Sequence, residues 1–211
     1  MICVSLPFVD EKTVGRLLDQ KFLVEVRLDL AKDKSAFCKV IKKYKQIIVT
    51  YRGGDDIAVR AKFFEKAIDC GIAYVDLDIT DSELKNILEE KLKNSPTRLI
   101  LSYHNFDVTP AKEKLVDIYE KCRSEGADIV KIVTMSNGVA DNAVIMSLYE
   151  FSQGDIIAFG MGNKGKITRI IAPFLGAPFT YACYSRGKKT AQGQIDYKSL
   201  KDMIATIEKY L

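Results

Sequence analysis

The sequence predicts an α/β fold in which eight parallel strands alternate with eight helices and close into a (β/α)8 TIM barrel. Three observations favour this class: strand-like and helix-like segments alternate along the chain, the repeat occurs eight times, and several strands are polar on one face only. Eight such repeats close naturally into a barrel, and 211 residues is near the lower limit for that fold. An open doubly wound sheet is the alternative, but its strands would be apolar on both faces. We expect one barrel domain over residues 1–211.

Eight segments rich in β-branched and aromatic residues, bounded by turn residues, have the pattern of short strands. They cover residues 2–6, 22–30, 47–51, 73–79, 98–103, 127–134, 155–159 and 179–184. The sixth is unusual because Lys131 lies in the middle of its apolar run. An unpaired ammonium group is costly to bury, so this residue needs an explanation.

Between the strands, apolar residues recur at helical spacing. The predicted helices cover residues 10–20, 35–44, 55–70, 81–93, 110–124, 139–152, 166–175 and 196–211. We expect Gly71 to end the third helix and Thr80 or Asp81 to be the N-cap of the fourth. Pro110 is expected at the first helical position of the fifth.

Composition restricts the classes of function. The net charge of +4 comes from charges of mixed sign, which favours a solvated lysine-rich surface over a nucleic-acid interface. No apolar run approaches the ~20 residues of a membrane-spanning helix, and the first residues lack the features of a signal peptide. The five cysteines have neither metal-ligand nor redox spacing. We therefore expect a cytoplasmic protein that binds no membrane, nucleic acid or metal.

Polar residues share one face of four predicted strands, because side chains alternate across a strand. These sets are Glu25, Arg27 and Asp29; Thr50 and Arg52; Asp76 and Asp78; and Ser102 and His104. In a barrel they would face the interior near the carboxyl-terminal mouth, where active sites of this fold lie. The alternative is an antiparallel sheet whose polar positions face solvent, but helical segments separate every pair of strands.

Lys131 has two interpretations. It either pairs with a carboxylate or lies at a strand edge, or it is a desolvated amine that attacks a carbonyl. Burial and the cations Arg27 and Arg52 favour the neutral amine, whereas Glu25 and the aspartates oppose it, so the sequence leaves the balance open. His104, the single histidine of the chain, ends the preceding strand. An amine beside a proton shuttle suits chemistry next to a carbonyl.

Two segments near the end of the chain suggest an anion site. Residues 162–165 form a glycine-rich stretch before a short helix, whose backbone N–H groups could cradle an anion. Arg169 offers a planar fork suited to a carboxylate. Thr190 and Gln194, in the last βα loop, supply a hydroxyl and an amide for a polyhydroxylated substrate. A flexible surface loop is the alternative.

In combination, six motifs make the sequence resemble the type I 3-dehydroquinate dehydratase family along nearly its whole length. They are Glu25-x-Arg27-x-Asp29, Thr50-Tyr51-Arg52, Ser102-x-His104-x-Phe106, Ala127-Asp128-Ile129-x-Lys131-Ile132, Met161-x-x-x-Gly165-x-x-x-Arg169 and Gly193-Gln194-Ile195. Members of this family are usually homodimeric (β/α)8 barrels. They convert 3-dehydroquinate to 3-dehydroshikimate and water in the shikimate pathway of aromatic amino acid biosynthesis. The resemblance implies an enzyme that uses no metal or dissociable cofactor.

The resemblance also implies a role for each matching residue. Lys131 would form a Schiff base with the C3 carbonyl, and His104 would remove the C2 proton and protonate the departing C1 hydroxyl. The other residues would bind the substrate. Its carboxylate would be held by Arg169, Gln194 and Thr190, and its ring hydroxyls by Glu25, Arg27 and Arg52. Met161 would pack near the ring, and Ser5 would be a further substrate-binding residue.

The sequence departs from the family pattern after the third strand. The family commonly has Ser-x-x-Glu-Gly-Gly there, and that glutamate hydrogen-bonds the catalytic histidine, whereas here Arg52 is followed directly by Gly53-Gly54-Asp55-Asp56. We hypothesise that Asp76, Asp78 or a neighbouring polar group orients His104 instead. We also expect a minimal barrel without the N-terminal hairpin that often plugs its bottom.

Two other functions remain open at this point. One is a class I aldolase-type lyase that forms a Schiff base with a phosphorylated or carboxylated sugar-like substrate, although Arg169 and Gln194 suit a carboxylate better. The other is a ligand-binding barrel without activity. Borohydride added with substrate would label Lys131 in an enzyme and leave a binding protein unlabelled.

Overall fold

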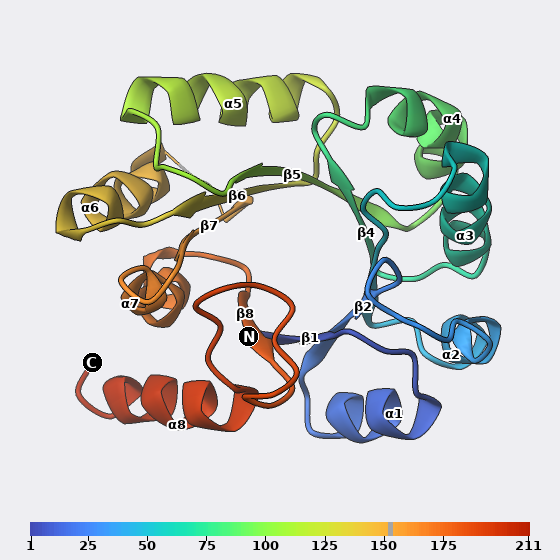
Figure 1. Cartoon of the computed structure of the whole chain (residues 1–211), viewed down its shortest axis with the longest axis horizontal. Coiled ribbons are helices and arrows are strands. Elements are labelled where there is room, and N and C mark those ends of the chain that lie inside the picture. Colours follow the sequence, from blue (N-terminus) through green and yellow to red (C-terminus); the bar gives the residue numbers. More distant parts are fainter. Residues whose placement is uncertain (152–153) are drawn as a thin grey trace.

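Eight parallel strands form a nearly closed barrel in the computed structural model, which describes residues 1–151 and 154–211 (Figure 1). The strands are β1 (Ile2–Leu6), β2 (Leu23–Arg27), β3 (Ile47–Thr50), β4 (Tyr74–Asp78), β5 (Arg98–Asn105), β6 (Ile129–Met135), β7 (Ile156–Met161) and β8 (Thr180–Cys183). They pair in the order β7-β6-β5-β4-β3-β2-β1-β8, and within the described residues no ladder joins β7 to β8. The predicted (β/α)8 class is confirmed.

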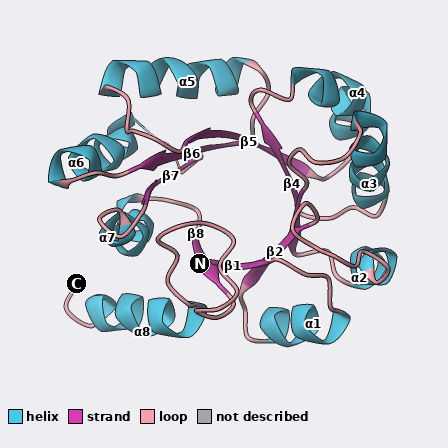
Figure 2. Ribbon diagram, viewed as in Figure 1, coloured by secondary structure: helices cyan, strands magenta, loops and turns pink. Residues whose placement is uncertain are grey.

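The helices form a ring outside the strands (Figures 1 and 2). They are α1 (Glu11–Asp19), α2 (Phe37–Lys43), α3 (Ile57–Asp69), α4 (Ser82–Lys93), α5 (Lys112–Ser124), α6 (Val139–Ser147), α7 (Lys166–Ile171) and α8 (Tyr197–Glu208), with short 3-10 helices η1 (Leu148–Phe151) and η2 (Ala172–Leu175). Among the described residues, none of these helices combines the length and apolar character that a membrane span requires.

Several helix ends differ from the predictions for identifiable reasons. Helix α5 begins at Lys112, so Pro110 precedes the helix and the prediction for it was wrong. The Thr109 hydroxyl donates to the carbonyl of Met135 at 2.8 Å, which ties the chain to β6 before the helix can start. Asp81 is the N-cap of α4, but its carboxylate pairs with Arg60 rather than with a helix N–H.

The two helices after β6 and β7 are shorter than predicted. The first changes to the 3-10 helix η1 after Ser147, and Ser152, the last residue predicted for it, lies outside the described residues. The second changes to η2, where Pro173 has no backbone N–H to continue the α-helix.

The hydrophobic core has two layers, one on each side of the strands. The larger layer lies between strands and helices and includes Val24, Val26 and Phe64. The smaller layer fills the lower barrel interior with residues such as Ile48 and Ile129. Nearer the carboxyl ends, the interior positions of β2 to β5 are polar, as predicted for these strands, whereas those of β6 to β8 other than Lys131 are mostly apolar or aromatic. The barrel interior is therefore apolar at its amino-terminal end and has a polar side at its carboxyl-terminal mouth.

Candidate active site

A cavity of about 480 Å³ opens at the carboxyl ends of the strands. Every residue predicted for the site lines this cavity except Ser5. The parallel register places the polar residues of neighbouring strands side by side: Ser5 lies opposite Glu25 across β1 and β2, and Lys131 lies opposite Ser102 across β5 and β6. The cavity thus gathers residues from most of the length of the chain.

Lys131 extends from the middle of β6 and is only 4% exposed. Its Nζ donates to Asp76 Oδ2 at 2.7 Å and lies 3.8 Å from Glu25 Oε1. The ring of Tyr181, on β8, lies with its centroid 4.0 Å from the same nitrogen. The ammonium group is therefore buried and paired with a carboxylate, while its tip borders the cavity.

Asp76 is the centre of the charge network around this lysine. Its fully buried carboxylate accepts from Lys131, from Ser102 Oγ at 2.7 Å and from Arg52 Nη2 at 3.2 Å. Burial alone would raise its pKa, but Lys131 and Arg52 outweigh burial and hold the pKa of Asp76 well below its usual range. The polar face of β4 indicated that Asp76 points inward, but sequence reasoning did not identify it as the direct partner of Lys131.

His104 stands beside Lys131 on the neighbouring strand, two residues beyond Ser102. Its Nδ1 lies 3.1 Å from Asp78 Oδ2, and its ring stacks on Phe106 at 6.0 Å between centroids. Burial, and then the positive charge of Arg52, lowers the pKa of His104 to about 4, against the opposing effect of Asp78. The imidazole is therefore neutral at pH 7 and able to accept a proton.

Glu25 is held in place by hydroxyl groups. Its carboxylate accepts from Thr50 Oγ1 at 2.8 Å and from the Ser5 hydroxyl, which in turn accepts from Thr190 Oγ1 at 2.7 Å. Ser5 therefore supports the cavity from behind rather than lining it. Arg27 makes a two-point pair with Asp29, at 2.9 and 2.6 Å, and its Nη1 donates to the carbonyl of Thr190 at 3.4 Å.

Arg169 is fully buried, on α7, and has no carboxylate partner among the described residues. Its guanidinium carbon lies 4.0 Å from the ring centroid of Phe159, and its Nε and Nη1 have no hydrogen-bond partner in the described part of the chain. Burial lowers the pKa of Arg169 to about 9. A desolvated guanidinium with free donors beside a cavity is suited to bind an anion, and best a carboxylate.

The loop formed by residues 184–196 lies over the mouth of the barrel (Figure 1). Gln194 Oε1 stabilises it by accepting from the backbone N–H groups of Thr190 at 2.8 Å and Ala191 at 3.2 Å. Gly193, with φ of +76°, packs directly on the backbone of Gly162. The loop thus presents Thr190 and Gln194 to the cavity.

The glycine-rich segment 162–165 has a different role from the anion cradle that the sequence suggested. Of this region, only the flanking residues Met161 and Arg169 line the cavity. Gly165 lies so close to Gly160 that an added Cβ would be 2.6 Å from its backbone. The glycines therefore serve close backbone packing, and the positive charge that this segment brings to the cavity is the side chain of Arg169.

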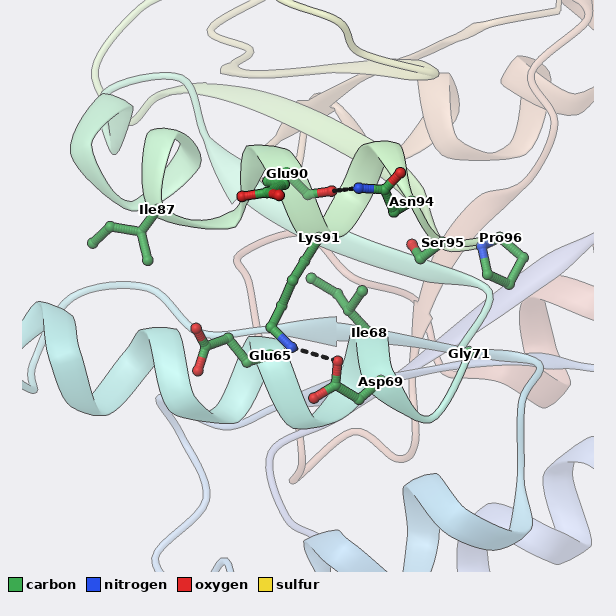
Figure 3. Close-up of a pocket in the computed structure, with 10 residues that line it drawn as sticks. All are labelled: Glu65, Ile68, Asp69, Gly71, Ile87, Glu90, Lys91, Asn94, Ser95 and Pro96. Atoms are coloured by element: carbon green, nitrogen blue, oxygen red, sulfur yellow. Dashed lines mark hydrogen bonds and ion pairs between the residues drawn. The ribbon is translucent and has the colours of Figure 1, made fainter.

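A second cavity, of about 610 Å³, lies between α3 and α4 at the opposite end of the barrel (Figure 3). Lys91 there pairs with Asp69 at 2.5 Å, and the Asn94 amide donates to the carbonyl of Glu90 at 3.0 Å. The Lys91 ammonium group in this cavity thus has a carboxylate partner, unlike the guanidinium of Arg169. No three His, Cys, Asp or Glu side chains in the described part of the chain converge as metal ligands would.

Comparison with known proteins gives a consistent result. A family model described as type I 3-dehydroquinase matches residues 2–210. A 3-dehydroquinate dehydratase of Methanocaldococcus jannaschii is 37% identical, covering 96% of this chain and 97% of the relative, and that of Pyrococcus abyssi is 38% identical, covering 85% and 84%. A solved type I 3-dehydroquinate dehydratase of Clostridium difficile has the same fold, with a TM-score of 0.84 at 19% identity over 100% of this chain and 93% of that one. The chain belongs to the type I 3-dehydroquinase family.

Proposed function

We propose that this enzyme dehydrates 3-dehydroquinate to 3-dehydroshikimate through a Schiff base on Lys131, with His104 as the proton-transfer group. Family membership supports the reaction, which is a step of the shikimate pathway, and favours it over the aldolase alternative. One observation carries the assignment of residues. Lys131 and His104 line the same cavity as Arg169, whose buried guanidinium has no carboxylate of its own among the described residues.

The reaction begins when the Lys131 amine, after losing a proton, attacks the C3 carbonyl. The carbonyl oxygen leaves as water, and a protonated imine forms. This cation replaces the ammonium between Asp76 and the ring of Tyr181, so its positive charge is already matched by the site.

The protonated imine withdraws electrons and makes the C2 proton acidic. His104 removes this proton to give an enamine, and then returns it to the C1 hydroxyl, which departs as water. Hydrolysis of the product imine restores the Lys131 amine. Because the covalent imine is itself the electron sink, we propose that no metal or dissociable cofactor takes part.

The other cavity residues hold the substrate. Arg169, with Thr190 and Gln194, binds the carboxylate, because its unpaired donors suit the two carboxylate oxygens. The ring hydroxyls lie against Glu25, Arg27 and Arg52, and Met161 packs near the ring. Ser5 acts through Glu25. We further propose that the enzyme is a single barrel domain, works in the cytoplasm and forms a homodimer.

Borohydride reduction in the presence of 3-dehydroquinate tests this function. We expect one substrate-derived adduct per chain, mapped by peptide mass spectrometry to Lys131, because reduction fixes the imine. The Lys131→Met variant should give no adduct and should lose at least about a thousandfold in kcat, measured by the absorbance of the conjugated product. A label on another lysine, or an undiminished rate in the variant, would contradict the proposal.

A further inference from the structure

We propose that Asp78 fixes the tautomer of His104, so that Nδ1 carries the proton and Nε2 is the proton acceptor available to the cavity. Asp78 is then a positioning residue, which acts on the substrate only through His104. The tautomer itself can be tested without reference to the reaction, whereas its kinetic consequence rests on the function proposed above.

The contact between the two side chains determines the direction of the hydrogen bond. His104 Nδ1 lies 3.1 Å from Asp78 Oδ2, and an ionised carboxylate can only accept a hydrogen bond. Burial would raise the pKa of Asp78, but hydrogen bonds from His104 and Thr80 outweigh it and lower that pKa, so Asp78 is ionised at pH 7. Since a neutral imidazole has one N–H, Nδ1 must hold it, and Nε2 has no partner among the described residues.

The Asp78 carboxylate is itself held in a fixed orientation. Its other oxygen, Oδ1, accepts from the backbone N–H of Thr80 at 3.1 Å and from the Thr80 hydroxyl at 2.7 Å. The imidazole is stacked on Phe106 with 18° between the ring planes. Each oxygen of the carboxylate therefore has a separate task, one in the turn after β4 and one on His104.

The other charges near His104 do not perform this task. Arg52, just after β3, and Lys131 on β6 disfavour the imidazolium, and Asp76 on β4 already pairs with both of these cations. Asp78 is the anion in hydrogen-bond contact with the ring. It therefore both selects the tautomer before proton transfer and stabilises the imidazolium that forms during it.

The single histidine of the chain makes a direct measurement possible. We would record two-bond ¹⁵N–¹H spectra of the imidazole in the untagged, ¹⁵N-labelled chain at pH 7. We expect the Nδ1–H tautomer in the parent and in Thr80→Val, which removes only the hydroxyl bond of the turn. Asp78→Ala should lose this preference. The Nε2–H form in the parent would overturn the inference, even if no Asp78 variant folds.

Steady-state kinetics gives the second test. We expect Asp78→Ala to lower kcat by about 10- to 100-fold with KM changed by less than about threefold. Thr80→Val loses one bond to the carboxylate but keeps the backbone bond to Asp78 Oδ1, so it should lower kcat by only about two- to fivefold. The acid limb of the kcat/KM profile should move to lower pH in Asp78→Ala, because Asp78 raises the pKa of His104. The inference would be overturned if Asp78→Ala left kcat and the acid limb of the pH profile unchanged, or if Thr80→Val lowered kcat as much as Asp78→Ala does. Failure to label Lys131 in the parent would instead contradict the proposed function.

Discussion

At the scale of single residues, Arg169 stands out as a fully buried cation that has no carboxylate partner among the described residues. Lys131 and Arg52 share the carboxylate of Asp76, and Arg27 has Asp29, whereas the guanidinium of Arg169 makes a long hydrogen bond, of 3.5 Å, to the carbonyl of Gln192. A buried charge without a partner destabilises the folded state. We therefore expect Arg169 to cost stability in the free enzyme and to recover that cost when a carboxylate binds.

Replacing Arg169 should change stability and affinity in opposite directions. Arg169→Met removes the unpaired charge at similar volume, so we expect the free enzyme to gain about 1–2 kcal/mol in unfolding free energy, measured with urea. Loss of charged hydrogen bonds to the carboxylate should raise KM by about 10- to 150-fold. Arg169→Lys, which keeps the charge, should raise KM without that gain. A less stable Arg169→Met variant with unchanged KM would refute this account of the residue.

The inward-facing polar residues could be predicted from alternation along each strand, but their partners could not. Period-two spacing requires only that Asp76 and Lys131 point into the barrel. Which carboxylate reaches the lysine depends on strand stagger and on long side-chain rotamers, and these are set by the whole barrel. The same holds for Tyr181, which crosses the interior from β8 to contact Lys131. Sequence reasoning considered Asp78 for His104, but it could not separate this residue from Asp76.

At the scale of elements, the loop of residues 184–196 depends on a close backbone contact. A Cβ on Gly193 would lie 2.3 Å from the carbonyl oxygen of Gly162, and Gly193 has a positive φ that other residues rarely adopt. A Cβ added to Gly187, in the same loop, would have no described atom within 4 Å, and the φ of Gly187 is not positive. The two glycines therefore form a matched pair for testing whether the docked loop is needed.

Gly193→Ala should displace the loop, and Gly187→Ala should not. Because Thr190 and Gln194 reach the cavity from this loop, we expect Gly193→Ala to raise KM and lower kcat by about tenfold each. Trypsin should also cleave faster at the exposed Arg186, Lys188 and Lys189. Equal kinetics and equal cleavage in the two variants would show that the loop acts independently of this contact.

Element order was predictable because each strand and helix has its own hydrophobic period, but element ends were not. Loop contacts decide them, as the bond from Thr109 to Met135 shows for the start of α5. The sequence of β7 and β8 likewise contains no pattern that would predict the missing ladder between these two strands. Eight repeats predict closure, and β1 does pair with β8, but hydrogen bonding between β7 and β8 depends on how these two strands lie relative to each other in the whole barrel.

At the scale of the whole molecule, the barrel buries a titratable histidine in a cavity where two nearby cations oppose its protonation. His104 is the only histidine, and the groups facing it are Arg52, Lys131, Asp76 and Asp78. Its pKa is about 4 in the folded chain, against about 6.5 when exposed. Between these values the unfolded chain binds a proton that the folded chain does not, so stability must fall as the pH falls through this window.

Urea unfolding at pH 7 and pH 5 should therefore reveal the burial of this one side chain. Each pH unit below 6.5 costs about 1.36 kcal/mol, so we expect the unfolding free energy to be about 2 kcal/mol lower at pH 5 than at pH 7. The carboxylates with lowered pKa, Asp76 and Asp78, lose their contribution only below this range. His104→Gln should show almost none of the drop, because no other histidine titrates there. A drop of the same size in His104→Gln would mean that another group is buried uncharged, and that His104 is accessible to water at its position beside Lys131.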